Sequence, residues 1–268
     1  MPGVVFISDL HLGDTRWTAE RYELLDDFLD SFVAKYVSRL VIVGDLVEWI
    51  QWDVTAVARS FRQLQRIFTL AGSGVAVDYV IGNHDIDLCQ IELTWPVRFV
   101  YPRLHLDIDG YSFHIEHGHF FDPTVNTWPE AAAFFTRWAG RALDKVGPGF
   151  EDVLGRFKER LLKGRKETTG QKGSGGKQQE MDAYKKGAMT ACAHTHDFMV
   201  MGHTHTRTVQ GLGVPGKVRD EAVYVNTGDW QVHSDFILVI NGCVYGMSWP
   251  ADRREAMAVM NAALHRPA

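Results

Sequence analysis

Five short apolar runs along the chain each end abruptly in polar side chains. They cover residues 4–8, 41–43, 75–81, 113–116 and 198–201. Apolar runs of this length, bounded by glycine and polar residues, are typical of buried strands. We therefore expect these runs to be strands whose ends carry the polar groups.

Apolar residues at helical spacing separate the first three runs. They recur every three or four positions across residues 18–36, and a second helix is expected across residues 54–70. Strands that alternate with helices form a βαβαβ unit with a parallel sheet. The turn signals Asp109-Gly110 and Asn241-Gly242 predict antiparallel hairpins later in the chain. The expected fold class is α/β.

The segment 125–194 differs in character from the rest of the chain. We expect a core built from residues 1–124 and 195–268, with this segment inserted as helices joined by a flexible loop rich in glycine and lysine at 164–177. The insertion is either a packed helical element with a solvated basic face or a lid that offers an apolar groove rimmed by positive charge. The expected helices of the insertion cover residues 129–146, 150–162 and 178–194.

Composition narrows the classes of function. A chain of 268 residues with 46% hydrophobic residues can bury a large core, and a net charge of −5 argues against a stable nucleic-acid partner. The three cysteines, Cys89, Cys192 and Cys243, have no paired spacing, which favours reduced thiols. The chain has neither a leader pattern nor an apolar window of about 18 residues. We expect a cytoplasmic protein whose membrane contact, if any, is peripheral at the cytoplasmic face.

The strand ends carry side chains that bind metals. Asp, Asn and His with few cysteines favour Mn²⁺, Fe²⁺ or Zn²⁺ over a thiolate site. Two cations about 3.5 to 4 Å apart need a shared ligand, and the carboxylate of Asp45 is placed for that role. The motifs are Asp9-x-His11, Gly44-Asp45, Gly82-Asn83-His84-Asp85, His117-Gly118-His119 and Gly202-His203-Thr204-His205.

Single motifs have ordinary explanations. Asp9-x-His11 alone could be a helix cap beside a surface histidine, and Gly44-Asp45 alone is typical of a turn. His203 and His205 are more specific, because paired histidines after an apolar strand have little use in packing. Chance does not explain the presence of all five motifs in this order along one chain.

The ordered set resembles the calcineurin-like metallophosphoesterases over about residues 3–230. The resemblance implies a β-sandwich flanked by helices, with two divalent cations at the carboxyl edge. It also implies that His84 faces the scissile phosphate as a general acid or a charge stabiliser, that Asn83 helps to neutralise the phosphate oxygens and that Asp85 orients His84. The ligands that it implies are Asp9, His11, Asp45 and His205 for one cation, and Asp45, Asn83, His117 and His203 for the other.

A narrower resemblance concerns the UDP-2,3-diacylglucosamine pyrophosphatase group of lipid A synthesis. It rests on residues 9–13, residues 44–49, the helical insertion after His117 and the sequence Gly228-Asp229-Trp230. His84 and His119 depart from that group, which tends to have Arg and Asp at these positions. The resemblance implies a glycolipid substrate and an insertion that covers its acyl chains.

Two other functions stay open from the sequence. One is a metallophosphoesterase for a soluble nucleotide, phosphoprotein or nucleic acid, for which the basic stretch 156–186 is the only support. The other is a non-enzymatic metal-binding scaffold, which the complete ligand set argues against. His119 could contact substrate or metal, and Glu48 and Asp229 could support the ligands. Four further histidines, His114, His194, His196 and His233, are expected to be structural or to support the ligands.

Overall fold

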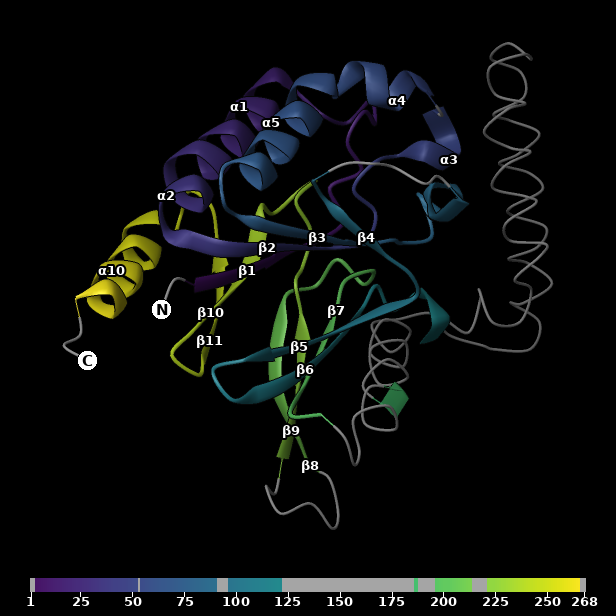
Figure 1. Cartoon of the computed structure of the whole chain (residues 1–268). Helices are drawn as coiled ribbons and strands as arrows, with labels where there is room; N and C mark the ends of the chain where they lie inside the picture. The colour runs from purple at the N-terminus through teal and green to yellow at the C-terminus, as the bar shows by residue number, and fades with distance from the viewer. Residues whose placement is uncertain are drawn as a thin grey trace, which may run out of the picture.

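The computed structural model describes residues 3–52, 54–90, 96–121, 186–187, 196–213 and 221–265. These residues form two mixed sheets that pack face to face, with helices on the outer face of the first sheet (Figure 1). The prediction of an α/β fold with a helix-flanked β-sandwich is therefore confirmed. The predicted insertion and its loop lie outside the described residues, except for 186–187.

The first sheet has six strands in the order β11-β10-β1-β2-β3-β4. Strands β1 to β3 are parallel, as the βαβαβ pattern predicted, and β4 also pairs parallel with β3. β10 and β11 add antiparallel pairs at one edge, so the sheet is mixed. The strands are β1 (Gly3–Ile7), β2 (Val37–Val43), β3 (Ala76–Val80), β4 (Arg98–Val100), β10 (Asp235–Ile240) and β11 (Cys243–Ser248).

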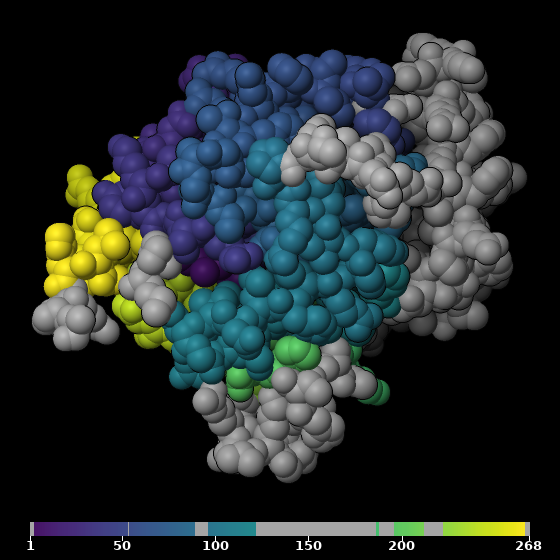
Figure 2. Space-filling model, viewed as in Figure 1, coloured from purple at the N-terminus to yellow at the C-terminus, as the bar shows by residue number. Residues whose placement is uncertain are grey.

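The second sheet has five strands in the order β5-β6-β7-β9-β8. Its three central strands are parallel to one another, and β5 and β8 pair antiparallel at the edges. The strands are β5 (Arg103–Ile108), β6 (Tyr111–Glu116), β7 (Phe198–Met201), β8 (Thr208–Gly213) and β9 (Glu221–Asn226). Figure 2 shows the teal side chains of the β4–β6 region on the same face as the blue helical layer above them.

Alternating side chains explain why β1 appeared as a continuous apolar run. Val4 and Phe6 point into the core between the two sheets, whereas Val5 and Ile7 point into the core under the helices. A strand buried on both faces loses the usual polar alternation. Both predicted hairpin turns are present, with positive φ at Asp109-Gly110 and Asn241-Gly242, which is the conformation that two-residue hairpin turns require.

The helices differ from the predicted ones in detail. The predicted helix 18–36 is interrupted by a π-helical turn, and the predicted helix 54–70 is broken at Ser60, whose hydroxyl donates to the Ala56 carbonyl (2.7 Å). The C-terminal helix α10 was not predicted. The helices are α1 (Ala19–Phe28), η1 (Leu29–Val33), α2 (Ala34–Tyr36), α3 (Trp49–Trp52), α4 (Val54–Arg59), α5 (Phe61–Gly72), η2 (Ile86–Gln90), η3 (His119–Phe121) and α10 (Arg253–Leu264). Within the described part of the chain, no helix combines the length and apolar character needed to cross a bilayer.

Candidate metal centre

The predicted ligands follow the carboxyl ends of strands in both sheets. β1, β2 and β3 are parallel neighbours in the first sheet, and β6 and β7 are parallel neighbours in the second. The loops after these strands therefore meet at one edge of the sandwich. The structure brings together side chains of Asp9, His11, Asp45, Asn83, His84, His117, His203 and His205.

One group consists of Asp9, His11 and His205. Asp9 Oδ1 lies 3.2 Å from His205 Nε2 and 4.0 Å from His11 Nε2. The other oxygen of Asp9 accepts from Ser8 Oγ and from the His203 N–H (2.9 Å). Asp9 Oδ1 and His11 Nε2 are buried, and neither has a hydrogen-bond partner among the residues that the structure describes. Because an unsatisfied buried polar group is costly, these two atoms fit the ligand shell of a cation.

A second group consists of Asp45, His117 and His203, whose possible ligand atoms lie within 4.8 Å of one another. His117 Nε2 is 3.1 Å from Asp45 Oδ2 and 3.1 Å from Asn83 Oδ1. The Asn83 side chain therefore joins this group, where its amide oxygen can serve as a hard ligand. The donor set of carboxylate, amide oxygen and imidazole fits Mn²⁺, Fe²⁺ or Zn²⁺.

Asp45 belongs to the second group and also faces His11 of the first. Its Oδ2 is 3.1 Å from His117 Nε2 and 3.8 Å from His11 Nε2, while its Oδ1 accepts from the His84 N–H (2.9 Å). The side chain is buried. One carboxylate thus faces nitrogen ligands that come from both sheets, which is the arrangement that two cations with a shared ligand require.

The backbone is strained where it presents these ligands. Residues in the left-handed region cost about 1 to 2 kcal/mol each, and such outliers persist where the surrounding structure holds them. Here the loops after β1 and β2 hold each other, because the His11 N–H donates to the Asp45 carbonyl (2.8 Å) and the Asp9 N–H to the Gly44 carbonyl (3.2 Å). The non-glycine ligand residues with positive φ are Asp9, His11, Asp45, His203 and His205.

Two motif glycines allow the ligands to approach this closely. A Cβ atom on Gly44 would lie 2.1 Å from His117 Nδ1, and a Cβ atom on Gly82 would lie 2.1 Å from Asp45 Oδ1. Each glycine therefore leaves room for a ligand from another motif. This explains in physical terms why glycine precedes Asp45 and Asn83.

Glu48 orients two histidines of the site. Its fully buried carboxylate accepts from Nδ1 of His11 (2.8 Å, Oε2) and Nδ1 of His84 (2.7 Å, Oε1). Burial alone would raise the pKa of Glu48, but the bonds to the two histidines lower it to about 2. An ionised carboxylate can only accept, so Nδ1 of His11 carries the proton and Nε2 is free to bind a cation. The sequence suggested only a supporting role for Glu48, from its place beside the Gly44-Asp45 motif.

His84 lies at the margin of the site. Its side chain is 25% exposed, and its ring packs edge-on against that of His11, with centroids 4.6 Å apart. Burial alone would lower the pKa of His84, but Asp45 and Glu48 raise it to about 9. A protonated imidazole at the open side of the site can donate a proton. His84 also forms a possible ligand group with His11 and Asp45.

Asp85 differs from its predicted role. Its carboxylate accepts from the Gly82 N–H (2.8 Å), the Leu46 N–H (2.7 Å) and the Tyr79 hydroxyl. These bonds fasten the turn after β3 to the end of β2, whereas the partner that orients His84 is Glu48. Burial and the neighbouring Asp45 raise the pKa of Asp85 to about 6. The expectation that Asp85 orients His84 is therefore corrected.

His117 has the electrostatic surroundings of a metal ligand. Its Nδ1 donates to the Val43 carbonyl (2.8 Å), so the neutral ring has its lone pair on Nε2, the atom that faces Asp45. Burial alone would lower the pKa of His117, but Asp45 raises it to about 10. In turn, burial alone would raise the pKa of Asp45, and His117 lowers it well below its usual value. A proton on His117 thus balances the buried carboxylate in a chain without a cation.

Further residues support the site from the second sheet. Asn226, at the end of β9, donates to the Gly202 carbonyl (2.7 Å) and accepts from the Gly228 N–H (3.0 Å). Asp229 accepts from His233 Nδ1 (2.5 Å) and so holds the turn after β9. The ring of buried His119 lies 5.6 Å from that of His117. The role of Asn226 was not predicted. Like the predicted ligands, Asn226 is a polar residue at the end of a strand, and this position could have pointed to it.

The chain is similar to two solved proteins and to one protein family. A solved protein of unknown function from Aquifex aeolicus is 16% identical, with 84% of this chain and 90% of that chain covered and a TM-score of 0.37. The nuclease MPE of Pseudomonas putida is 14% identical, with 91% and 87% covered and a TM-score of 0.38. No curated protein matches the chain. The sequence pattern of the calcineurin-like phosphoesterase family matches residues 3–207. The chain therefore belongs to the calcineurin-like phosphoesterase family and is a metal-dependent phosphoester hydrolase.

Proposed function

We propose that the strand-end loops hold two divalent cations, Mn²⁺ in preference to Fe²⁺ or Zn²⁺, for hydrolysis of a phosphoester or pyrophosphate bond. The observation that carries the proposal is the place of Asp45 between His11 Nε2 (3.8 Å) and His117 Nε2 (3.1 Å). The proposed ligands are Asp9, His11, Asp45 and His205 for one cation and Asp45, Asn83, His117 and His203 for the other.

The protein side chains divide the remaining work. Bound divalent cations supply Lewis acidity and lower the pKa of water. Asn83 offers its amide N–H groups to a phosphate oxygen while its Oδ1 faces His117. His84, protonated at neutral pH because its pKa is raised to about 9, gives its proton to the leaving oxygen as the oxygen–phosphorus bond breaks and water adds to phosphorus.

For the substrate, we propose an acylated nucleoside-diphosphate sugar of the UDP-2,3-diacylglucosamine type, cleaved to UMP and the acylated sugar 1-phosphate. Support comes from the resemblance of residues 9–13 and 44–49 to that pyrophosphatase group. The proposal includes peripheral contact with the cytoplasmic face of a membrane, where such a glycolipid resides, and a lid role for the insertion 125–194.

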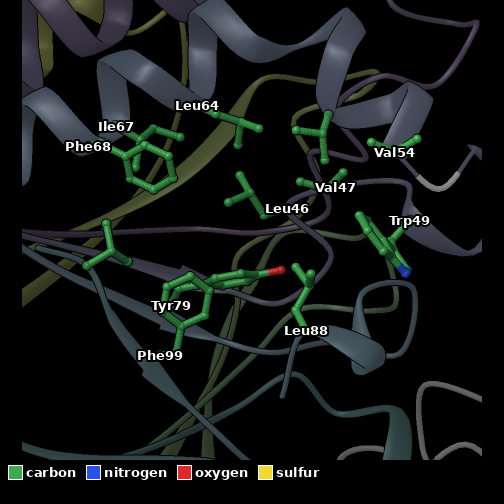
Figure 3. A pocket seen from close by; sticks show the side chains of 12 residues that line it. Leu46, Val47, Trp49, Val54, Leu64, Ile67, Phe68, Tyr79, Leu88 and Phe99 are labelled. Carbon is green, nitrogen blue, oxygen red and sulfur yellow. The ribbon is translucent and has the colours of Figure 1, made fainter. Parts of the chain in front are cut away.

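An apolar cavity whose lining begins with Leu46, the residue after Asp45, adds support for an amphiphilic substrate. It has a volume of about 230 Å³ and lies between the first sheet and helices α3 to α5 (Figure 3). Leu46, Val47 and Trp49 line the cavity. Glu48 lies between Val47 and Trp49 in the sequence, and its carboxylate accepts hydrogen bonds from His11 and His84. An apolar part of the substrate bound there would keep the phosphate near Asp45 by proximity.

Metal dependence is the first test. The chain is stripped of metal with a chelator, reloaded with Mn²⁺, Fe²⁺ or Zn²⁺, and assayed on a small phosphodiester, a nucleotide and the acylated UDP-sugar. We expect two cations per chain at full activity, the highest turnover with Mn²⁺, and the largest kcat/KM for the acylated UDP-sugar. Activity that persists at fewer than one cation per chain would contradict the dinuclear centre.

The acyl chains provide the second test. Each buried methylene contributes about 0.8 kcal/mol, so chains shortened by four carbons should lower kcat/KM by up to about 3 kcal/mol, roughly a hundredfold. The small phosphodiester, which has no acyl chain, is the matched control. If the length of the acyl chains does not change kcat/KM, and a soluble nucleotide or nucleic acid is cleaved faster, that compound is the substrate instead of the glycolipid. The proposal of a dinuclear metal centre would be unaffected.

A further inference from the structure

The second sheet carries a cluster of three histidines that none of the strand-end motifs includes. His105 on β5 and His114 on β6 are directly opposite each other in the antiparallel register. His196 precedes β7, and the next residue, Asp197, accepts from the N–H and the hydroxyl of Ser112 (2.9 Å each). These bonds fix His196 beside β6. Three separate parts of the chain thus place imidazole rings at one point.

The rings lie close enough to share one ion. His105 Nδ1 is 2.9 Å from His196 Nε2, and one nitrogen of each ring lies within 4.8 Å of the others. The ring centroid of His114 is 4.8 Å from that of His105 and 5.1 Å from that of His196. The carboxylate of Glu116 adds Oε1 at 3.4 Å from His114 Nε2. Ligands of tetrahedral Zn²⁺ are about 3.3 Å apart when each bond is about 2.0 to 2.1 Å.

The burial of His114 is the strongest evidence that the cluster binds a cation. The residue is 3% exposed, and within the described ranges neither of its ring nitrogens has a hydrogen-bond partner. A buried polar group without a partner costs about 1 to 3 kcal/mol. Glu116 is buried as well, at 2% exposed. A cation would give the His114 ring a partner, and the Glu116 carboxylate lies close enough to join it.

The cluster is separate from the candidate dinuclear centre. Phe113 and Ile115 point into the core between the sheets, so His114 and Glu116 lie on the opposite face of β6. The cluster shares no residue with the three strand-end ligand groups. Among the described residues, the cluster has no carboxylate placed to be shared by two ions, so it suits one ion.

We propose that His105, His114 and His196 form a second, mononuclear metal site for a late first-row divalent cation such as Zn²⁺, with Glu116 available as a fourth ligand. Three imidazoles favour Zn²⁺, Cu²⁺ or Ni²⁺ over the oxygen-seeking Mn²⁺. The ion would join β5 and β6 to the residue that leads into β7. The chain leaves the second sheet after β6 and returns to it at β7, so the ion would link these two places. Closing such a long loop lowers the conformational entropy of the unfolded chain more than that of the folded chain, which stabilises the fold.

Zinc binding tests the proposal in a chain with a weakened dinuclear centre. The full-length Asp45→Ala variant, without a histidine tag, is stripped of metal and titrated with chelator-buffered Zn²⁺. We expect one tightly bound Zn²⁺ per chain and a rise in Tm. Adding His105→Ala at the exposed ligand should weaken this binding by about a hundredfold or more, since loss of even an outer-shell partner costs about 10- to 100-fold. Adding His265→Ala at an exposed histidine of the C-terminal helix end is the matched control and should change neither value.

The location of the ion is tested by anomalous diffraction at the zinc edge on crystals of the same variant. A peak bounded by the three rings is the expected result. Zinc affinity unchanged by His105→Ala, or a peak found solely among the strand-end residues, would overturn the proposal. His114→Ala is avoided because its buried position could prevent folding, whereas His105 is exposed.

Discussion

The molecule carries two histidine clusters that are built in different ways. The strand-end cluster mixes imidazoles with the buried carboxylates of Asp9 and Asp45, and five of its seven proposed ligands have positive φ. The cluster on the second sheet is based on His105 and His114, which are paired residues of regular strands. Carboxylates on strained loops allow one ligand to serve two cations, whereas imidazoles on regular strands surround a single point.

One histidine of each cluster has its pKa shifted, and the two shifts run in opposite directions. Burial alone would lower the pKa of His117, but Asp45 overrides this and raises it to about 10. In the other cluster, burial and the neighbouring His114 lower the pKa of His105. A cation at the first cluster would have to displace the proton of His117, whereas the His105 ring of the second cluster is more easily neutral.

The largest effect should come from Asp45→Ala. Both cations lose a shared ligand, so turnover should fall by roughly 10⁴-fold or more and the strand-end centre should lose its metal. Metal content by elemental analysis and turnover of the small phosphodiester measure this. Asp107→Ala, at an exposed carboxylate of β5, is the control. An Asp45 variant that keeps two Mn²⁺ per chain would remove Asp45 from the centre.

His84→Ala separates proton transfer from metal binding. The expected loss is about 10²- to 10⁴-fold in turnover with unchanged metal content, as for a group that acts on the transition state. The loss should be smaller on a substrate whose leaving group needs no proton, such as a p-nitrophenyl ester. Should the variant lose a cation instead, His84 is a ligand together with His11 and Asp45.

Glu48→Gln tests the support of the strand-end cluster. The amide keeps the shape of Glu48 but removes the charge that orients His11 and His84, so Mn²⁺ affinity or activity should fall about 10- to 100-fold. Titration with Mn²⁺ measures the affinity, and Glu20→Gln on the exposed surface of α1 is the control. An unchanged affinity together with unchanged activity would show that the two hydrogen bonds are dispensable.

The pH dependence of stability tests the electrostatic coupling between His117 and Asp45. Because the pKa of His117 in the folded chain is raised to about 10, its contribution is present below the unfolded value of about 6.5 and is lost as pH rises through 10. The metal-free chain should therefore lose stability between pH 7 and pH 10, as measured by urea unfolding. The metal-free His117→Asn variant should lose less over the same range, and an equal loss in both would assign the effect to other groups.

The sequence predicted the parts of the site that lie in short motifs. Asp9, Asp45 and His203 each follow an apolar run or its glycine, so period and position were enough to place them at one edge of the sandwich; their roles as metal ligands stay a prediction. The roles of Glu48 and Asp85 depend on which neighbouring strand end each carboxylate reaches, and sequence spacing does not contain that information. Both carboxylates are buried and bonded across loops in the structure.

Long-range pairing accounts for what the sequence missed. His105 and His114 are opposite each other because of the hairpin register, and His196 reaches them only because β7 lies beside β6. The antiparallel pairing of β10 with β1 likewise has no local signal, since either edge of the parallel strands could accept it. Local periodicity predicts elements, whereas tertiary pairing decides which of their side chains meet.

The most direct test of the shared role of Asp45 is electron paramagnetic resonance of the chain loaded with two equivalents of Mn²⁺. If Asp45 serves both cations, the wild-type spectrum should show two exchange-coupled Mn²⁺ ions. The Asp45→Ala spectrum should show uncoupled or free Mn²⁺, because the three-histidine cluster does not favour this metal. Two uncoupled Mn²⁺ ions in the wild type, or coupling that survives in Asp45→Ala, would contradict a centre built around Asp45.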